Sequence, residues 1–327
     1  MSRFGATIFG CDGTTLGKEE RAFFSDARPF GFILFARNID TADQVRTLCA
    51  DLRDSVGYAA PILIDQEGGR VQRMRAPLAT EWPAPLDHVM GAGAAAERMM
   101  YLRYRLIAHE LHAVGVDANC APMLDVARPE THPFLKNRCY GDDPGLVARI
   151  GRAVANGLLD GGVLPVVKHL PGHGRAVADS HFDLPRVKVP VPELEADFAP
   201  FRALNDLPMG MTAHLVYEAL DTVPATISPG ILQLIRSDIG FGGLIMTDDI
   251  SMQALSGTVP ERAAAAIGAG CDVVLHCNGA LPERVAVAAA CGVMGPRAQE
   301  RAEAALAARR TPEPVDIQAL TAELKAF

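Results

Sequence analysis

The chain has 327 residues, of which 49% are hydrophobic and 21% are charged, which is ordinary for a globular protein. A net charge of −8 argues against nucleic acid as a general partner, because a phosphate backbone is bound by a basic face. No apolar run approaches the roughly 18 residues that a membrane span needs. The 7 cysteines are scattered without a Cys-x-x-Cys pair, and the N-terminus has no signal-peptide core, so we expect a reducing, cytoplasmic setting.

Short apolar runs alternate with amphipathic stretches along the chain. The runs that predict strands are residues 6–10, 31–36, 61–65, 117–122, 164–169, 209–214, 243–247 and 272–276. The stretches that predict helices are residues 41–54, 94–114, 144–159, 191–204, 229–238, 260–269 and 281–291. Apolar strands separated by helices indicate a parallel sheet covered on both faces. About eight such units in this length favour an α/β fold of the TIM-type (β/α)8 barrel over an open sheet.

No low-complexity linker or shift in composition marks a second domain. We therefore predict a single barrel domain over residues 1–327, with an extra C-terminal helix at about 296–310 and a proline-broken tail, together residues 296–327. In such barrels the catalytic groups gather where the strands end. Polar residues follow several of the predicted strands, and the sequence therefore predicts a site at that face.

The densest group of titratable residues lies between Lys168 and His181, directly after the apolar run 162–167. Charged groups at the mouth of a buried strand are costly unless chemistry uses them. Asp179 stands two residues before His181, so its carboxylate could hold one ring nitrogen while the other nitrogen faces a substrate. This spacing predicts a proton-transfer pair.

Asp248 and Asp249 follow the seventh predicted strand. Adjacent strand residues point to opposite sides, so we expect only one of the two to face the barrel axis. A carboxylate there could be a nucleophile, a metal ligand or the N-cap of the next helix. Because the His181 loop and several arginines accompany it in the sequence, we favour the nucleophile.

Further candidates follow the third and fourth strands. Asp65, Arg70 and Arg73 place a carboxylate and two guanidinium groups on one loop, which suits hydrogen bonds to a hydroxyl-rich ligand, a sugar above all. The alternative is an internal salt bridge between Asp65 and an arginine. Arg138 lies in a loop with nothing obvious to cap, and for it we favour ligand contact over a solvated surface position.

The histidines outside the pair have less specific surroundings. His173 could brace its glycine-flanked loop or line the site, and His214 could line the site or satisfy a buried carbonyl. His276 and Asp125 are expected to be structural. The segment from His109 to His112 resembles a zinc-protease helix, but its histidines are three residues apart instead of four, so we expect a solvated helix face.

Three stretches resemble the glycoside hydrolases of family 3, specifically their single-domain β-N-acetylglucosaminidases. They are residues 65–73, 168–181 and 234–251, and the segments 35–38 and 211–214 are also family-like. The resemblance covers about residues 5–277. Small departures are Leu170, where phenylalanine is commoner, and Arg175-Ala176; neither is a catalytic position.

The resemblance implies roles for individual residues. It makes Asp248 the nucleophile, His181 the acid/base and Asp179 its orienting partner. It also implies a set of residues that bind N-acetylglucosamine: Asp65, Arg73, Arg138, Lys168 and His169. No metal or cofactor is implied, the partner is a small carbohydrate, and we expect a monomer.

The implied reaction is two-step retention. Asp248 attacks the anomeric carbon while His181 protonates the leaving oxygen, and His181 then deprotonates water. Retaining glycosidases usually use two carboxylates, so the Asp/His pair departs from that pattern. An imidazole with an ordinary pKa near 6.5 can still give and take a proton at neutral pH. The resemblance further suggests cytoplasmic recycling of cell-wall fragments, with cleavage of N-acetylglucosamine from anhydro-N-acetylmuramic acid peptides.

Three alternatives remain open from the residues. Because His181 is not an anion, phosphate could replace water, which would make the protein a phosphorylase. A metal-dependent barrel hydrolase could be built from His169, His214, His276 and Asp248. A non-catalytic sugar-binding protein is the least favoured, because binding alone would not need the Asp179/His181 pair.

Overall fold

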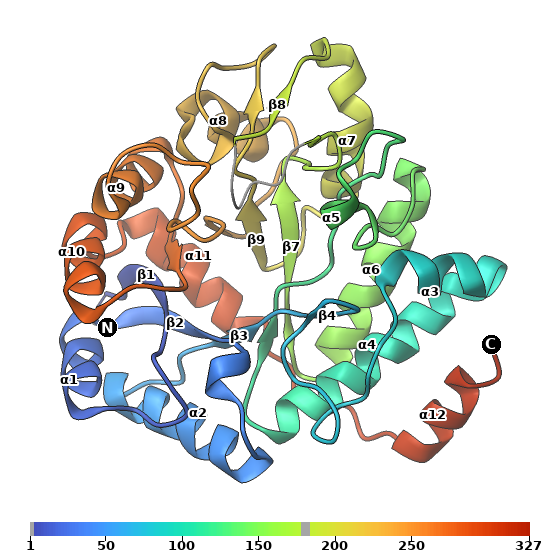
Figure 1. Cartoon of the computed structure of the whole chain (residues 1–327), viewed down its shortest axis with the longest axis horizontal. Coiled ribbons are helices and arrows are strands. Elements are labelled where there is room, and N and C mark those ends of the chain that lie inside the picture. The colour runs from blue at the N-terminus through green and yellow to red at the C-terminus, as the bar shows by residue number, and fades with distance from the viewer. Residues whose placement is uncertain (1–2, 178–183) are drawn as a thin grey trace.

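The computed structural model describes residues 3–177 and 184–327, and within them eight parallel strands follow the order β11-β9-β7-β6-β3-β2-β1-β12. The strands are β1 (Gly5–Gly10), β2 (Pro29–Leu34), β3 (Ile62–Ile64), β6 (Ala118–Asn119), β7 (Leu164–Leu170), β9 (Met209–Thr212), β11 (Leu244–Met246) and β12 (Val274–His276). A parallel bridge between Met246 and Val273 joins the two ends of the sheet. The sheet therefore closes on itself, and the expected TIM-type (β/α)8 barrel is confirmed (Figure 1).

Each barrel strand is followed by at least one helix that returns along the outside of the barrel (Figure 1). The helices are α1 (Lys18–Ala27), α2 (Ala42–Val56), α3 (Pro85–Ala92), α4 (Ala96–Ala113), α5 (Pro133–Lys136), α6 (Pro144–Asp160), α7 (Val191–Ala203), α8 (Pro229–Ser237), α9 (Val259–Ala269), α10 (Leu281–Cys291), α11 (Pro296–Ala307) and α12 (Ile317–Leu324), with short 3-10 turns η1 (Ala36–Asn38), η2 (Gly93–Ala95) and η3 (Ala225–Ile227). Two small sheets lie beyond the strand ends: β4 (Gln66–Gly68) with β5 (Val71–Gln72), and β8 (Arg186–Val187) with β10 (Val216–Tyr217).

Burial explains why the strand sequences are apolar without alternation. Every residue of β1, β2 and β7 is buried, because one side of each strand faces the barrel interior and the other faces helices. Several helices begin at a side-chain cap: Thr41 accepts from the N–H of Gln44 at the start of α2, and Asp143 accepts from the N–H of Leu146 at the start of α6. The barrel is thus a fixed frame for the loops at its strand ends. No helix in the described residues is both long and apolar enough to cross a membrane.

The C-terminal segment differs from the expectation. The helix expected at about 296–310 is α11, which ends at Ala307, and the tail expected to be proline-broken contains a further helix, α12. The Asp316 side chain accepts from two backbone N–H groups of α12, which starts a new helix after the prolines. Arg98 of α4 holds α12 through Glu323 at 2.7 and 2.8 Å. The helices α1 and α3 were also not expected from the sequence. The single-domain reading stays a prediction.

Candidate active site

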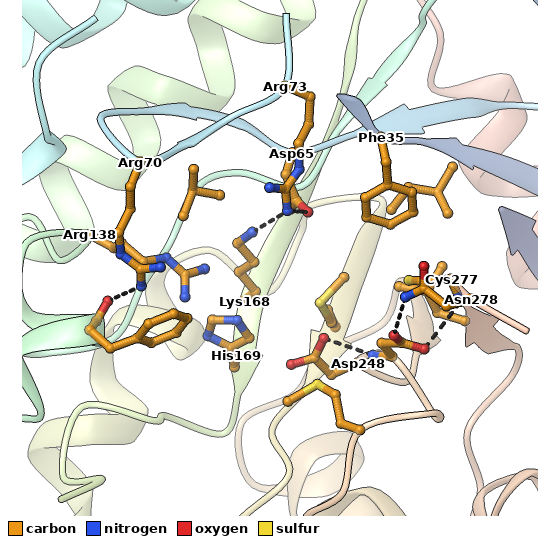
Figure 2. A pocket seen from close by; sticks show the side chains of 17 residues that line it. Phe35, Asp65, Arg70, Arg73, Arg138, Lys168, His169, Asp248, Cys277 and Asn278 are labelled. Atoms are coloured by element: carbon orange, nitrogen blue, oxygen red, sulfur yellow. Dashed lines mark hydrogen bonds and ion pairs between the residues drawn. The ribbon is translucent and has the colours of Figure 1, made fainter. Parts of the chain in front are cut away.

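A cavity of about 310 Å³ opens where the barrel strands end. The expected nucleophile Asp248 lines it, as do Arg70 and all the residues expected to bind the sugar: Asp65, Arg73, Arg138, Lys168 and His169. Figure 2 shows Asp65 and Lys168 on one side of the cavity and Asp248 on the other. These side chains come from segments far apart in the sequence, and the closed barrel brings them together.

One side of the cavity is a buried cluster of opposite charges, which we call the charged wall: Asp65, Glu67, Arg138 and Lys168. The Lys168 ammonium lies 3.0 Å from Asp65 Oδ1 and 2.6 Å from Glu67 Oε1. Arg138 donates from Nε and Nη2 to the two oxygens of Glu67, at 2.9 and 2.7 Å. Arg73 extends the wall, with Nη2 3.0 Å from Asp65 Oδ2. Asp65 therefore makes the salt bridge that was considered as the alternative to ligand binding, and it still lines the cavity.

The charged wall stays ionised at neutral pH. Burial raises the pKa of Asp65, but Lys168 and Arg73 outweigh it and bring the pKa below its ordinary value. Burial also raises the pKa of Glu67, and Arg138 followed by Lys168 reverses this. Burial lowers the pKa of Lys168, but Asp65 and Glu67 bring it above its ordinary value. The cavity therefore holds fixed charged donors and acceptors, the groups that form strong hydrogen bonds with hydroxyls.

Glu67 is a site residue that the sequence reasoning missed. Its side chain is 2% exposed and joins Lys168 to Arg138 behind the cavity. Arg103 of α4 and the hydroxyl of Tyr104 donate to its backbone carbonyl, so Glu67 is held at its backbone as well as at its carboxylate. The spacing of Glu67 from Asp65 could have indicated it, because residues two positions apart in an extended segment point to the same side.

His169 is held by a buried carboxylate. Its Nδ1 lies 2.7 Å from Asp125 Oδ2, so Nδ1 donates to this carboxylate and Nε2 is the ring nitrogen left for a ligand. Asp125, expected to be structural, thus orients a cavity residue. His173 does not line the cavity: it is 5% exposed, its backbone N–H donates to Asp125 at 2.6 Å, and its ring packs edge-on against His169. Burial, together with His169, lowers the pKa of His173 to about 4.

Asp248 stands across the cavity from the charged wall (Figure 2). Its Oδ1 accepts from the backbone N–H of Asp249 at 2.8 Å. Burial raises the pKa of Asp248, but the nearby His169 and this hydrogen bond outweigh it, so the pKa lies below its ordinary value. Asp248 is therefore an anion at neutral pH.

One expectation about this pair of carboxylates was wrong, and one of the alternatives is excluded. Asp248 and Asp249 both line the cavity, because β11 ends at Met246 and the alternation of a strand does not extend to them. Neither caps the next helix, since Thr258 is the N-cap of α9. The Asp249 carboxylate instead accepts from Ser251 Oγ at 2.7 Å and from the N–H of Cys277 at 3.1 Å.

The remaining histidines have partners of their own. His214 is fully buried and does not line the cavity. Its Nε2 lies 3.0 Å from the carbonyl oxygen of Asp249, so of the two roles considered for His214 the structure shows the second, a partner for a buried carbonyl. His276 is also fully buried, with Nε2 3.1 Å from Glu283. Within residues 3–177 and 184–327 no three His, Cys, Asp or Glu side chains are grouped to hold a metal ion. Asp179 and His181 lie outside the described residues.

Comparison with known proteins agrees with this fold. The sequence profile of the glycosyl hydrolase family 3 N-terminal domain matches residues 13–305. A β-hexosaminidase of Alkalilimnicola ehrlichii is 40% identical over 285 residues, 84% of this chain and 81% of the relative. The crystal structure of Neisseria gonorrhoeae NagZ with a zinc ion superposes with a TM-score of 0.85 at 32% identity, covering 99% of this chain and 96% of that one. NagZ from the same organism in complex with N-trifluoroacetyl-D-glucosamine gives a TM-score of 0.81 at 31% identity, covering 99% and 98%. The chain therefore belongs to glycosyl hydrolase family 3.

Proposed function

We propose that this family 3 β-hexosaminidase removes terminal, non-reducing β-linked N-acetylglucosamine with retention, and that Asp248 is its nucleophile. The observation that carries the proposal is an ionised carboxylate placed across one cavity from a wall of fixed hydrogen-bonding charges. The complex of a similar NagZ with N-trifluoroacetyl-D-glucosamine supports a sugar of this class.

In this proposal the charged wall binds the sugar hydroxyls. The carboxylate of Asp65 accepts from hydroxyls, Lys168 and Arg138 donate to their oxygens, and His169 contacts a hydroxyl through Nε2. Because ion pairs already hold these groups in place, the wall needs little reorganisation when the substrate enters. The sugar is thereby fixed with its anomeric carbon toward Asp248.

The chemistry proceeds in two displacements. Asp248 bonds to the anomeric carbon while the glycosidic C–O bond breaks, and His181 gives its proton to the leaving oxygen. His181 then takes a proton from water, whose oxygen attacks the same carbon and releases Asp248, and two inversions give net retention. Asp179 orients the imidazole and stabilises its cation. Support for His181 and Asp179 comes from their spacing and the family resemblance.

For the natural substrate we propose cytoplasmic peptidoglycan fragments in which N-acetylglucosamine is joined to an anhydro-N-acetylmuramic acid peptide. The family resemblance supports this assignment. Arg70 adds a physical reason: its guanidinium lies 3.3 Å from the centre of the Phe134 ring at the cavity, where a cation suits the carboxylates of a peptide.

The direct test compares an aryl β-N-acetylglucosaminide with the matching β-glucoside, in phosphate and in phosphate-free buffer. We expect hydrolysis of the first substrate, little of the second, free N-acetylglucosamine released as the β-anomer, and loss of activity in Asp248→Asn. Sugar 1-phosphate as the product would instead identify a phosphorylase. Activity that a chelator abolishes and a metal restores would favour the metal-dependent hydrolase, and binding without turnover would favour a sugar-binding protein.

The acid role of His181 has a test of its own. In His181→Gly we expect a loss of about 10²–10⁴-fold on substrates with poor leaving groups and little loss on activated aryl glycosides, whose leaving group needs no proton. Rates of the two substrates measured side by side check this. Equal losses on both would remove His181 from the acid role.

A further inference from the structure

A fully buried histidine stands behind the nucleophile without touching the cavity. His214 follows β9, and its Nε2 lies 3.0 Å from the carbonyl oxygen of Asp249. A carbonyl oxygen can only accept, so Nε2 carries the hydrogen. Burial lowers the pKa of His214, which keeps the ring neutral. Its Nδ1 must then accept a hydrogen bond, and the hydroxyl of Thr226 lies 2.7 Å away to donate it.

The hydrogen bonds behind His214 therefore run in one direction. The Oγ1 atoms of Thr212 and Thr226 are 2.8 Å apart. The single hydroxyl hydrogen of Thr226 goes to Nδ1, which is nearer than the competing Ala213 carbonyl at 3.1 Å. Thr212 must then donate to Thr226. This relay of hydrogen bonds runs from Thr212 through Thr226 and His214 to Asp249. Thr212, Thr226 and His214 are all 0% exposed.

Asp249 connects this relay to the nucleophile. Its N–H donates to Asp248 Oδ1 at 2.8 Å. The residue is held at two further points, at its carbonyl by His214 and at its carboxylate by Ser251 and Cys277. Because its carbonyl and its carboxylate are both held, Asp249 keeps its N–H pointed at Asp248. The bond from this N–H to Oδ1 leaves Oδ2 of Asp248 as the oxygen for attack.

We propose that His214 and Thr226 are positioning residues, which hold Asp249 so that its N–H aims the Asp248 carboxylate at the anomeric carbon. The inference rests on the proposed function of Asp248 as the nucleophile. Attack requires the reacting atoms to be about 3–3.5 Å apart and aligned, and a misplacement of about 1 Å can cost roughly 100-fold in rate. A neutral, oriented imidazole supplies such alignment without adding a charge beside the reacting carboxylate.

The test uses a matched pair of threonine variants and a probe that isolates the attack. Thr226→Val keeps the shape but removes the hydroxyl, whereas Thr226→Ser keeps the hydroxyl. A 5-fluoro-N-acetyl-β-glucosaminyl fluoride labels the nucleophile, and its fluoride leaves without an acid, so the rate does not depend on His181. We expect the saturating labelling rate to fall by about tenfold or more in Thr226→Val and to stay near wild type in Thr226→Ser.

A second pair changes the imidazole itself. His214→Leu removes both hydrogen bonds and should lose at least as much rate as Thr226→Val, while His214→Gln keeps an N–H donor for the Asp249 carbonyl and should lose less. The probe concentration at half-saturation should stay within about twofold in all variants, because the charged wall is untouched. If His214→Leu fails to fold, the threonine pair still decides.

The possible outcomes separate the two proposals. Wild-type labelling rates in Thr226→Val would overturn the positioning role. Equal losses of rate and of N-acetylglucosamine affinity, with no rescue in Thr226→Ser, would overturn it as well, since that pattern belongs to a general structural role. A wild-type protein labelled at a residue other than Asp248 would instead refute the proposed function, whatever the variants do.

Discussion

The two sides of the cavity use charge in opposite ways. On the charged wall, Lys168 and Arg138 lie within 3.0 Å of Asp65 or Glu67, so these charges are paired and immobile. Across the cavity, the side chain of Asp248 accepts, among the described residues, a single hydrogen bond, from a backbone N–H. The comparison suggests that groups which only bind are locked by ion pairs, whereas the group that must form a bond is kept ionised without a salt bridge that it would have to break.

Removing the carboxylate of Asp248 should affect catalysis and not folding. We expect Asp248→Asn to lower kcat/KM by about 10⁴-fold or more while the free energy of unfolding changes by less than about 1 kcal/mol. Steady-state kinetics and urea unfolding measure the two quantities. Asp142→Asn, at an exposed position, is the matched control and should leave both unchanged. A strongly destabilised Asp248→Asn would show that this side of the cavity is also structural.

Breaking the charged wall should, in contrast, lower the stability of the fold. Glu67→Gln leaves Arg138 and part of Lys168 buried without a compensating charge, and we expect a loss of about 3–5 kcal/mol in the free energy of unfolding, with a raised KM. Urea unfolding measures the loss. Glu81→Gln breaks an ion pair with Arg75 whose side chains are 48% and 45% exposed, so its cost should be at most about 1 kcal/mol. Similar losses in both variants would contradict a special role for burial.

Acid should weaken the charged wall over a pH window that the pKa of Glu67 sets. Opposing burial, Arg138 and Lys168 lower the pKa of Glu67 from 4.5 to about 2. A depressed pKa means that the unfolded chain binds the proton more readily, so the stabilisation is complete above about pH 4.5 and declines as the pH falls toward 2. The difference in unfolding free energy between wild type and Glu67→Gln should therefore shrink over this window. A difference independent of pH would refute the assignment.

The smallest effect should come from the edge of the wall. Arg73 makes one 3.0 Å bond to Asp65 and lies 5.5 Å from the centre of the Phe35 ring. Arg73→Lys keeps the charge but loses the planar fork, and we expect KM to rise by roughly fivefold, about 1 kcal/mol, with kcat nearly unchanged. Arg75→Lys, on the same loop, is the control. A large fall in kcat would place Arg73 in the chemistry instead.

Much of the fold could be predicted because its cause is local. Each of the eight apolar runs holds or overlaps a barrel strand, since burial on both faces leaves a continuous apolar sequence. The helices α1 and α12 were missed: the N-cap of α1 is Gly17, which makes no side-chain cap hydrogen bond, and α12 follows prolines that indicated a broken tail.

The site could be predicted only in part. Asp65 and Asp248 follow strands and Lys168 lies near the end of one, and the barrel rule places strand ends together. The pairing of Glu67 with Arg138 joins residues 71 positions apart and depends on packing that no spacing reveals. A buried carbonyl was one of the partners considered for His214, but the sequence does not show that it is the carbonyl of Asp249.

The central claim is that Asp248 forms the bond to sugar. Its most direct test is to trap the glycosyl-enzyme with the 5-fluoro-N-acetyl-β-glucosaminyl fluoride, digest the protein and locate the added mass by tandem mass spectrometry. We predict one modified peptide, with the sugar on Asp248, and no label in Asp248→Asn. A sugar attached to Asp249 or any other residue, or turnover of aryl N-acetylglucosaminides without any covalent intermediate, would contradict the account.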